Sequence, residues 1–271
     1  MWLPSYATLS ERIGRAALLA FVLLVLAFLV APFLVVVPLS FSRDPFFSLP
    51  VRAYSLRWYE DFFGNARWLA SLWNSLVAAA LTTALATALG TACALGLSRP
   101  DFPWRRAAMA FVLSPMVVPV VIVAVGCYLS FGAVGLVNTR TGLVLAHTAL
   151  ALPFVVVTVA ATLSTYDERL TLAARSLGAP PLSAFLRVTL PAIMPGLVSG
   201  AVFAFAVSFD EVVVALFLTA AENRTLPVQM FSGIRDQINP TIMAAATLLL
   251  VLSVALFGTA SWLGGRGGAR G

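Results

Sequence analysis

RLTLAARSLGAPPLSAFLRVTLPAIMPGLVSG, residues 169–200, is a stretch between long apolar runs that polar residues, glycine and proline interrupt. Just before it, Thr165 and Glu168 stand three residues apart, which is the capping-box pattern of a helix start. Gly178 lies where that helix would end in a left-handed turn, a conformation that glycine reaches without steric cost. The stretch therefore predicts a short helix that begins near Thr165 and stops at Gly178.

A second short helix is predicted after the turn. Pro180 and Pro181 cannot continue the first helix, but proline suits the first turn of the next one. Apolar residues at helical spacing are Leu170, Ala173, Ala174 and Leu177 in the first helix and Leu182, Phe185, Leu186 and Leu190 in the second. We expect Pro191 and Pro195 to end the second helix. The result is a surface hairpin that offers an apolar face to a partner, or an ordinary amphipathic hairpin at the membrane interface.

The order and spacing of these residues resemble the EAA loop of ABC-transporter permeases, the membrane subunits of binding-protein-dependent importers. That pattern runs Glu-Ala-Ala, three residues, Gly-Ala, then Phe, an aliphatic residue and Leu-Pro. The matching residues are Ala173, Ala174, Gly178, Ala179, Phe185, Val188, Leu190 and Pro191. Leu172 occupies the glutamate position, which removes the carboxylate of a polar contact to the ATPase. The resemblance implies a type I ABC importer permease with residues 165–195 as its cytoplasmic coupling loop.

Apolar residues dominate the chain: 61% of its 271 residues are hydrophobic, and the mean hydropathy is +0.97. A membrane-spanning helix needs about 20 apolar residues, and lipid requires every backbone polar group to be satisfied internally. Runs of that length cover residues 16–41, 69–97, 107–131, 142–163, 196–220 and 241–264. We therefore predict an all-α integral membrane protein with six transmembrane helices, as a single domain over residues 1–271 with its core at about 69–264.

Prolines and small residues distinguish particular spans. Pro115 and Pro119 fall in the third run and Pro153 in the fourth, so these helices are expected to kink or unwind locally. Broken helices around a central pathway are typical of transporters. In the second run, a row of small residues is expected to let helices approach closely: Ala84, Ala88 and Ala92.

All 17 basic residues are arginine. Without lysine, the chain has no Walker A phosphate loop and no Schiff-base lysine, so ATP would have to be bound by another chain. With both termini in the cytoplasm, ten arginines lie inside and seven outside, which is a positive-inside bias. Residues 98–106 and 164–195 are then cytoplasmic. Residues 42–68, which include Trp58 and Tyr59, are expected to form an external interfacial helix.

Two adjacent acids, Asp210 and Glu211, fall inside the fifth span. A charge at the middle of a membrane costs at least about 2.5–3.5 kcal/mol, so each carboxylate needs compensation. One hypothesis is a cation site, in which a carboxylate replaces water around a positively charged substrate. The other is a structural ion pair with a neighbouring helix or a partner subunit. Residues differ by about 100° around a helix, so the two acids are expected to have different roles.

The segment SFDEVVVALFLT, followed by LPVQMFSGIRDQINP, resembles the corresponding region of spermidine/putrescine permeases. This resemblance favours polyamines or a related organic cation over another small solute. His147, the only histidine, lies in the fourth span, where it makes an interhelical hydrogen bond or relays protons. No second histidine or cysteine cluster accompanies it, so no metal site is expected.

We therefore expect a multi-pass permease subunit in a bacterial inner membrane, without catalytic residues of its own. The resemblance implies partner chains: ATP-binding subunits that hold ATP and Mg, a second permease subunit and an external substrate-binding protein. A proton-coupled secondary transporter that uses Asp210, Glu211 and His147 is the alternative from another class. A membrane-embedded enzyme would need a convergent catalytic set, and the few ionisable residues inside the spans argue against one.

Overall fold

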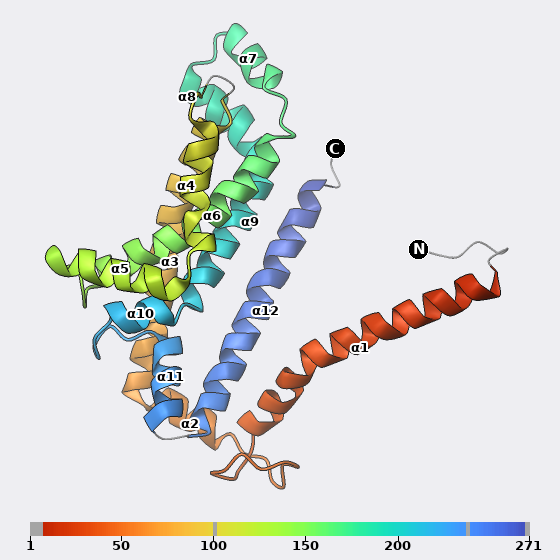
Figure 1. Cartoon of the computed structure of the whole chain (residues 1–271), viewed down its shortest axis with the longest axis vertical. Helices are drawn as coiled ribbons and strands as arrows, with labels where there is room; N and C mark the ends of the chain where they lie inside the picture. The colour runs from red at the N-terminus through yellow and green to blue at the C-terminus, as the bar shows by residue number, and fades with distance from the viewer. Residues whose placement is uncertain (1–7, 100–101, 237–238, 269–271) are drawn as a thin grey trace. The chain divides into compact units, whose positions relative to one another are not determined.

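The computed structural model describes residues 8–99, 102–236 and 239–268, in which helices are the only regular secondary structure. Their order is shown in Figure 1. The helices are α1 (Leu9–Ser40), α2 (Arg57–Gly64), α3 (Ala66–Leu97), α4 (Arg105–Val117), α5 (Val120–Ala133), α6 (Arg140–Leu163), α7 (Arg169–Ser176), α8 (Pro181–Ala184), the π-helical turn η1 (Phe185–Thr189), α9 (Leu190–Phe209), α10 (Val213–Leu218), α11 (Leu226–Asp236) and α12 (Thr241–Gly268).

The predicted all-α membrane fold is confirmed. Within the described ranges, five helical segments are long and apolar enough to cross a membrane, and α4 with α5 makes a sixth if that bent pair is one span. The chain divides into two compact units, residues 1–64 with 238–249 and residues 65–237 with 250–271. The grouping of all residues into one functional domain stays a prediction.

Proline breaks the third predicted span but not the fourth. The axes of α4 and α5 differ by 103° across a short break. Val118 is extended there, with ψ of 132°, because the ring of Pro119 disfavours a helical residue before it. In contrast, Pro115 lies inside α4 and Pro153 inside α6, and both helices continue through them. The predicted interruption is therefore confirmed at Pro119, whereas at Pro115 and Pro153 the helix does not unwind and a kink stays a prediction.

The first unit is tied together around α2. The indole Nε1 of Trp58 donates to the carbonyl of Ser42 at 2.7 Å, and the Tyr59 hydroxyl shares a hydrogen bond of 2.8 Å with Ser40. Trp58 is 5% exposed, so its ring packs inside this unit. A helix is thus present in the predicted external segment, and its position at a membrane interface stays a prediction.

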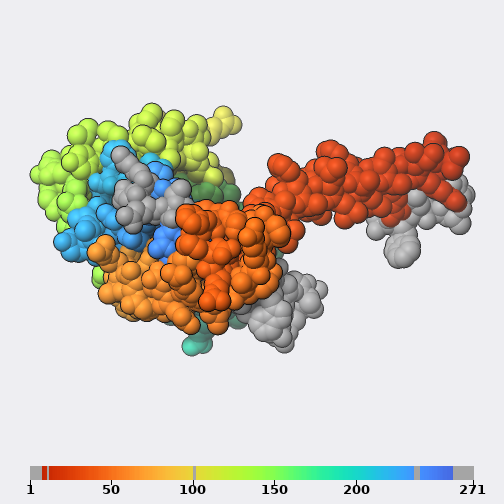
Figure 2. All heavy atoms as spheres, turned by 90° about the horizontal axis from the view of Figure 1, so that it is seen from below, coloured from red at the N-terminus to blue at the C-terminus, as the bar shows by residue number. Residues whose placement is uncertain are grey.

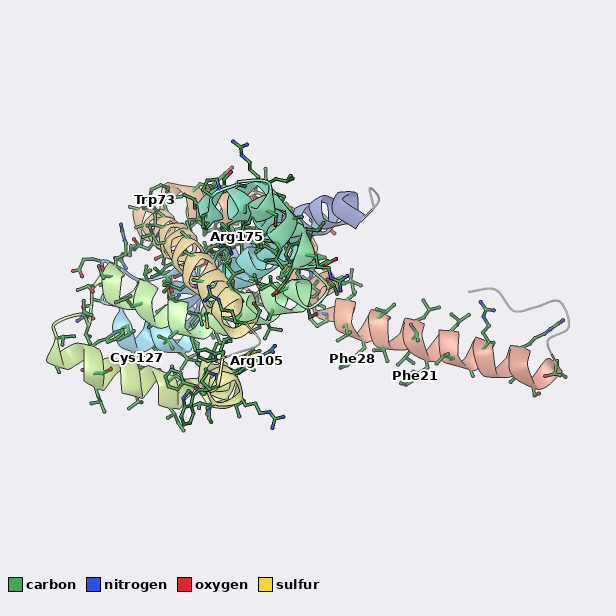
Figure 3. The ribbon with its side chains drawn as sticks, turned by 90° about the horizontal axis from the view of Figure 1, so that it is seen from above. Phe21, Phe28, Trp73, Arg105, Cys127 and Arg175 are labelled. Carbon is green, nitrogen blue, oxygen red and sulfur yellow. The ribbon has the colours of Figure 1, made fainter. Side chains whose placement is uncertain are left out.

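Helix α1 presents apolar side chains around its whole circumference. Phe21 is 64% exposed and Phe28 is 75% exposed, and both project from the helix in Figure 3. Figure 2 shows the same helix, in red, as a continuous surface of side chains. A bare helix of this kind is stable only where lipid or another apolar surface covers it.

The core of the second unit is built by α3, α6 and α9, which pack on one another through small residues. A Cβ atom at Gly90 would lie 2.7 Å from the Val155 Cβ, and one at Gly200 would lie 2.6 Å from the Thr158 Oγ1. Glycine therefore sets the spacing between these helices, as is common where helix backbones approach closely in membranes.

The packing row on α3 differs from the predicted one. Ala86 and Ala94 are fully buried with Gly90 between them, whereas Ala84, Ala88 and Ala92 are exposed. The prediction was wrong about which face packs within this chain, because alanine is common around the entire helix. Composition alone therefore could not distinguish the contact face from the exposed one.

Candidate functional site

The predicted coupling loop begins with a different cap from the one expected. The Thr165 hydroxyl donates to the carbonyl of Thr162 at 3.0 Å, and Glu168 makes no side-chain capping bond. Instead the carboxylate of Asp167 accepts from the Arg169 backbone N–H at 2.9 Å. The predicted capping box is wrong because the threonine hydroxyl bonds back to the last turn of α6, and Asp167 takes its place.

The turn after α7 agrees with the prediction. Gly178 has φ of +90°, and the backbone N–H groups of Gly178 and Ala179 donate to the carbonyls of Arg175 and Ala174 at 3.0 and 3.1 Å. A Cβ atom on Gly178 would meet nothing within 4 Å. The need for glycine here thus comes from the left-handed backbone and not from crowding.

The second short helix does not end at Pro191 and Pro195, where it was predicted to end. Pro181 occupies the first turn of α8, as expected, but the helix then passes through η1 directly into α9. In η1 the Leu190 N–H donates to the Phe185 carbonyl, five residues back. This wider turn immediately precedes Pro191, whose ring would clash with a carbonyl in an ordinary α-helical turn. The loop is therefore a short helix joined by a turn to the start of a membrane span.

Three hydroxyl groups connect the two halves of the loop. Tyr166 shares a hydrogen bond of 2.6 Å with Thr171 on α7, and Thr171 shares one of 2.9 Å with Thr189 on η1. Thr189 is 7% exposed, so this contact lies inside the loop. Sequence reasoning missed all three residues. No local sequence signal marks them, because Tyr166 lies between α6 and α7 while Thr189 is 18 residues beyond Thr171.

The loop presents an apolar surface to its surroundings. Leu172 is 58% exposed and Leu177 is 90% exposed. Of the other predicted coupling residues, Ala173, Gly178 and Pro191 are exposed, while Ala174, Ala179, Phe185 and Leu190 are partly buried. Exposed leucines on a short helix are suited to contact with an apolar groove of another protein.

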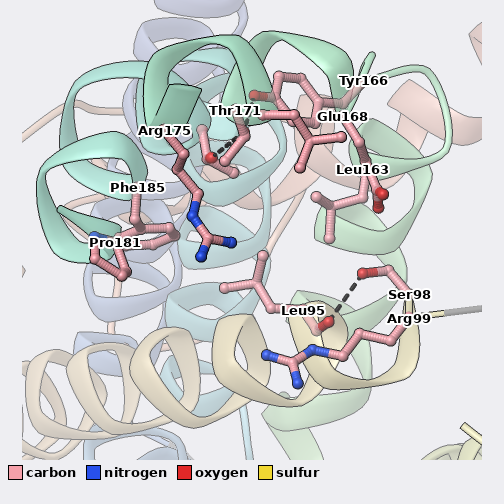
Figure 4. Close-up of a pocket in the computed structure, with 12 residues that line it drawn as sticks. Leu95, Ser98, Arg99, Leu163, Tyr166, Glu168, Thr171, Arg175, Pro181 and Phe185 are labelled. Atoms are coloured by element: carbon pink, nitrogen blue, oxygen red, sulfur yellow. Dashed lines mark hydrogen bonds between the residues drawn. The ribbon is translucent and has the colours of Figure 1, made fainter. Parts of the chain in front are cut away.

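A cavity of about 550 Å³, which we call the loop pocket, lies between the loop and the C-terminal end of α3. Leu172 and Phe185 from the predicted coupling set line it, together with Glu168. Arg175, from α7, and Arg99, which follows α3, also line it. Figure 4 shows the Arg175 side chain reaching toward Leu95 and the Arg99 side chain lying along the end of α3. The structure thus brings part of the predicted coupling set together with two arginines that sequence reasoning did not select.

The two acids of the fifth predicted span lie at a helix break. Asp210 is the last cap residue of α9, and Glu211 precedes α10 in non-helical backbone. A carboxylate oxygen of Glu211 accepts from the Val214 N–H at 2.8 Å and so caps α10. The expected continuous helix over residues 196–220 is therefore wrong, and the difference between the two acids comes from this break.

His147 forms the interhelical hydrogen bond that was one of its two predicted roles. Its ring is fully buried, and Nδ1 lies 2.8 Å from the Ser208 hydroxyl on α9. Nε2 has no hydrogen-bond partner. Among the described residues, no group of three or more His, Cys, Asp or Glu side chains could hold a metal ion.

These elements define an all-helical membrane permease with an exposed loop between spans. The chain belongs to the family of binding-protein-dependent transport system inner membrane components, which residues 86–266 match. Such a component is a transport subunit of bacterial ABC importers and not an enzyme. It is an integral protein of the inner membrane.

Curated relatives cover most of the chain. The spermidine/putrescine transport system permease protein PotC of Haemophilus influenzae is 33% identical over 88% of this chain and 92% of its own length. The putrescine transport system permease protein PotI of Escherichia coli is 34% identical over 89% of this chain and 87% of its own. A probable molybdenum ABC transporter permease of Haloferax volcanii is 36% identical over 72% of this chain and 77% of its own length.

Solved structures show the same fold. A bacterial ABC transporter that imports alginate matches with a TM-score of 0.76 and 17% identity, covering 94% of this chain and 99% of that one. The methionine transporter MetNI, in an inward-facing form, matches with a TM-score of 0.60 and 20% identity, covering 73% of this chain and 95% of that one. At these identities the likeness establishes the arrangement of helices and no more.

Proposed function

We propose that this chain is the permease subunit of an ATP-driven importer of polyamines, spermidine or putrescine, or of a related organic cation. The observation that carries this proposal is the 33–34% identity to spermidine/putrescine and putrescine permeases over nearly nine-tenths of the chain. The molybdenum relative covers a smaller part, 72%. The competing proposal is that this chain, like that relative, serves an importer of a different small solute.

The acids at the α9–α10 break support a cationic substrate. Glu211 is engaged as the cap of α10, whereas Asp210 is exposed in this chain. We therefore assign the pathway role to Asp210 and a structural role to Glu211. A carboxylate at a helix break can replace part of the water around an amine, and non-helical backbone at membrane depth is tolerated where it lines a hydrated pathway.

The remaining assembly follows from the same proposal. Two ATPase subunits would bind ATP and Mg, and a second permease and an external binding protein would complete the importer. Both termini would lie in the cytoplasm. The coupling residues Leu172, Ala173, Ala174, Gly178, Ala179, Phe185, Leu190 and Pro191 would meet the ATPase. Leu172 replaces the usual glutamate, so this contact would depend on apolar burial more than on a carboxylate.

Competition uptake in intact cells tests the substrate class. Cells that depend on this importer are given labelled spermidine with an excess of putrescine, magnesium or molybdate. We expect putrescine to compete and molybdate to have no effect. Competition by molybdate, without any by putrescine, would transfer the assignment to an oxyanion.

Neutral variants then test the role of each acid. Asp210→Asn keeps the shape and removes the charge, so we expect it to abolish most cation uptake while the complex still assembles. Glu211→Gln retains an oxygen that can cap α10 and should leave most uptake in place. Full uptake by Asp210→Asn would remove Asp210 from the substrate pathway.

A further inference from the structure

The loop pocket brings together two guanidinium groups that are distant in sequence. Arg99 follows α3 and Arg175 is near the end of α7, yet both residues line the same cavity, on either side of Leu95 in Figure 4. Among the residues drawn there, no hydrogen bond joins either guanidinium to Glu168. Like charges that face one cavity repel each other, and an anion placed between them would convert that repulsion into attraction.

Among the residues that the structure describes, Glu168 supplies the one carboxylate that lines the loop pocket, and it does not balance the charge of the two arginines. Glu168 lines the loop pocket, but it also lines a neighbouring cavity of about 100 Å³ that Arg105 shares. Three arginines therefore border the two cavities against one acid. The formal charges of these four described lining residues sum to +2, which favours an anionic ligand.

The hydroxyl chain in the wall supplies a further donor. Tyr166, Thr171 and Thr189 all line the loop pocket and share two hydrogen bonds among three hydroxyl groups. Two of the three O–H hydrogens are used in those bonds, so the third remains to donate elsewhere. A hydroxyl donor and two guanidinium forks that line one cavity are a donor set that suits the several oxygens of a phosphate.

We propose that the loop pocket binds a phosphate-bearing anion between Arg99 and Arg175. Its volume of about 550 Å³ admits either a phospholipid headgroup or a small soluble phosphate compound. Bound there, the anion bridges α7 to the end of α3 and holds the coupling loop in one position against the bundle. The site is separate from the acids at the α9–α10 break, and its ligand has the opposite charge to the proposed substrate.

Lipid binding is tested with the full-length chain in nanodiscs of phosphatidylcholine that contain increasing amounts of phosphatidylglycerol. Native mass spectrometry measures the phosphatidylglycerol that stays bound. We expect Arg99→Gln and Arg175→Gln each to weaken this binding by about tenfold, because each removes a charge-assisted bond. Arg106→Gln removes the same charge from a neighbouring exposed position that lies outside the loop pocket, and it should bind as the unaltered chain does.

A soluble ligand is tested by adding inorganic pyrophosphate to the same chain in phosphatidylcholine alone and measuring its thermal stability. Stabilisation by pyrophosphate that Arg99→Gln and Arg175→Gln abolish identifies a soluble phosphate. Binding of phosphatidylglycerol without stabilisation by pyrophosphate identifies a lipid headgroup. Circular dichroism shows whether the variants remain folded. If Arg175→Gln does not fold, Arg175→Lys tests the same position with its charge retained.

Binding of neither anion, or equal weakening by Arg106→Gln, would overturn the proposal. So would two pocket variants that bind both anions normally but lose association with an ATPase.

Discussion

Asn74 is hydrogen-bonded through both ends of its amide. Its Nδ2 group donates to the backbone carbonyls of Glu222 and Arg224 at 3.0 and 3.2 Å, and its Oδ1 accepts from Arg140 at 3.2 Å. The side chain is 8% exposed. A single residue of α3 thus holds the segment between α10 and α11, which has little secondary structure of its own.

Asn74→Ala would leave two backbone carbonyls in part-buried positions, and one guanidinium, without this partner. We expect a loss of stability of about 1–3 kcal/mol, seen as a lower thermal midpoint of the purified chain. Glu222→Ala is the matched control, because it keeps the backbone carbonyl and removes only an exposed side chain. Equal midpoints for Asn74→Ala and Glu222→Ala would show that the amide does not hold the segment.

Gly178 tests the coupling loop at the same scale. Its φ of +90° makes Gly178→Val cost about 1–2 kcal/mol locally, because a β-branched residue resists the left-handed region. We expect normal membrane insertion but reduced association with the ATPase, measured by co-purification. Gly178→Asn, which tolerates this conformation better, should retain most of the association. Normal ATPase association by Gly178→Val would exclude the turn from coupling.

At the scale of elements, the close packing of α6 with α9 depends on glycine. A Cβ atom at Gly200 would lie 3.0 Å from the Val155 Cα, and backbone cannot move aside as a side chain can. Gly96, near the end of α3, has open space around it. The two positions therefore separate the cost of overpacking from the ordinary effect of alanine in a helix.

We expect Gly200→Ala to destabilise the bundle by about 1–3 kcal/mol through overpacking. Gly96→Ala should instead stabilise it by up to about 1 kcal/mol, because alanine is the better helix former. Thermal unfolding in detergent, followed by circular dichroism, measures both. Opposite shifts support the packing that the structure shows, and stabilisation by Gly200→Ala would contradict it.

Sequence reasoning predicted the elements better than their boundaries. The apolar runs gave the spans and Gly178 gave the turn, because both signals depend on local chemistry. The break after Asp210 has no proline or glycine to mark it, and the apolar residues on both sides resemble one helix. The capping residue of α7 and the packing face of α3 depend on distant or competing contacts. The loop pocket could not be predicted, since it joins Arg99 to residues about 75 positions further along the chain.

The orientation of the whole molecule is tested by labelling with an impermeant thiol reagent on intact cells. Single cysteines at Ser48 and Ser98 are placed in a chain in which Cys93 and Cys127 are replaced by alanine. We expect labelling at Ser48 and none at Ser98, because the arginine distribution puts residues 98–106 inside. Labelling only at Ser98 would reverse the proposed topology.

In the proposed importer, this chain carries polyamines when an ATPase drives it. The most direct test reconstitutes the chain with its ATPase, second permease and binding protein in liposomes and measures labelled spermidine that becomes enclosed. We expect accumulation that requires ATP and Mg together with the binding protein, and that stops when this chain is omitted. Accumulation by the chain alone under a proton gradient, or no accumulation of spermidine or putrescine by the complete assembly, would contradict it.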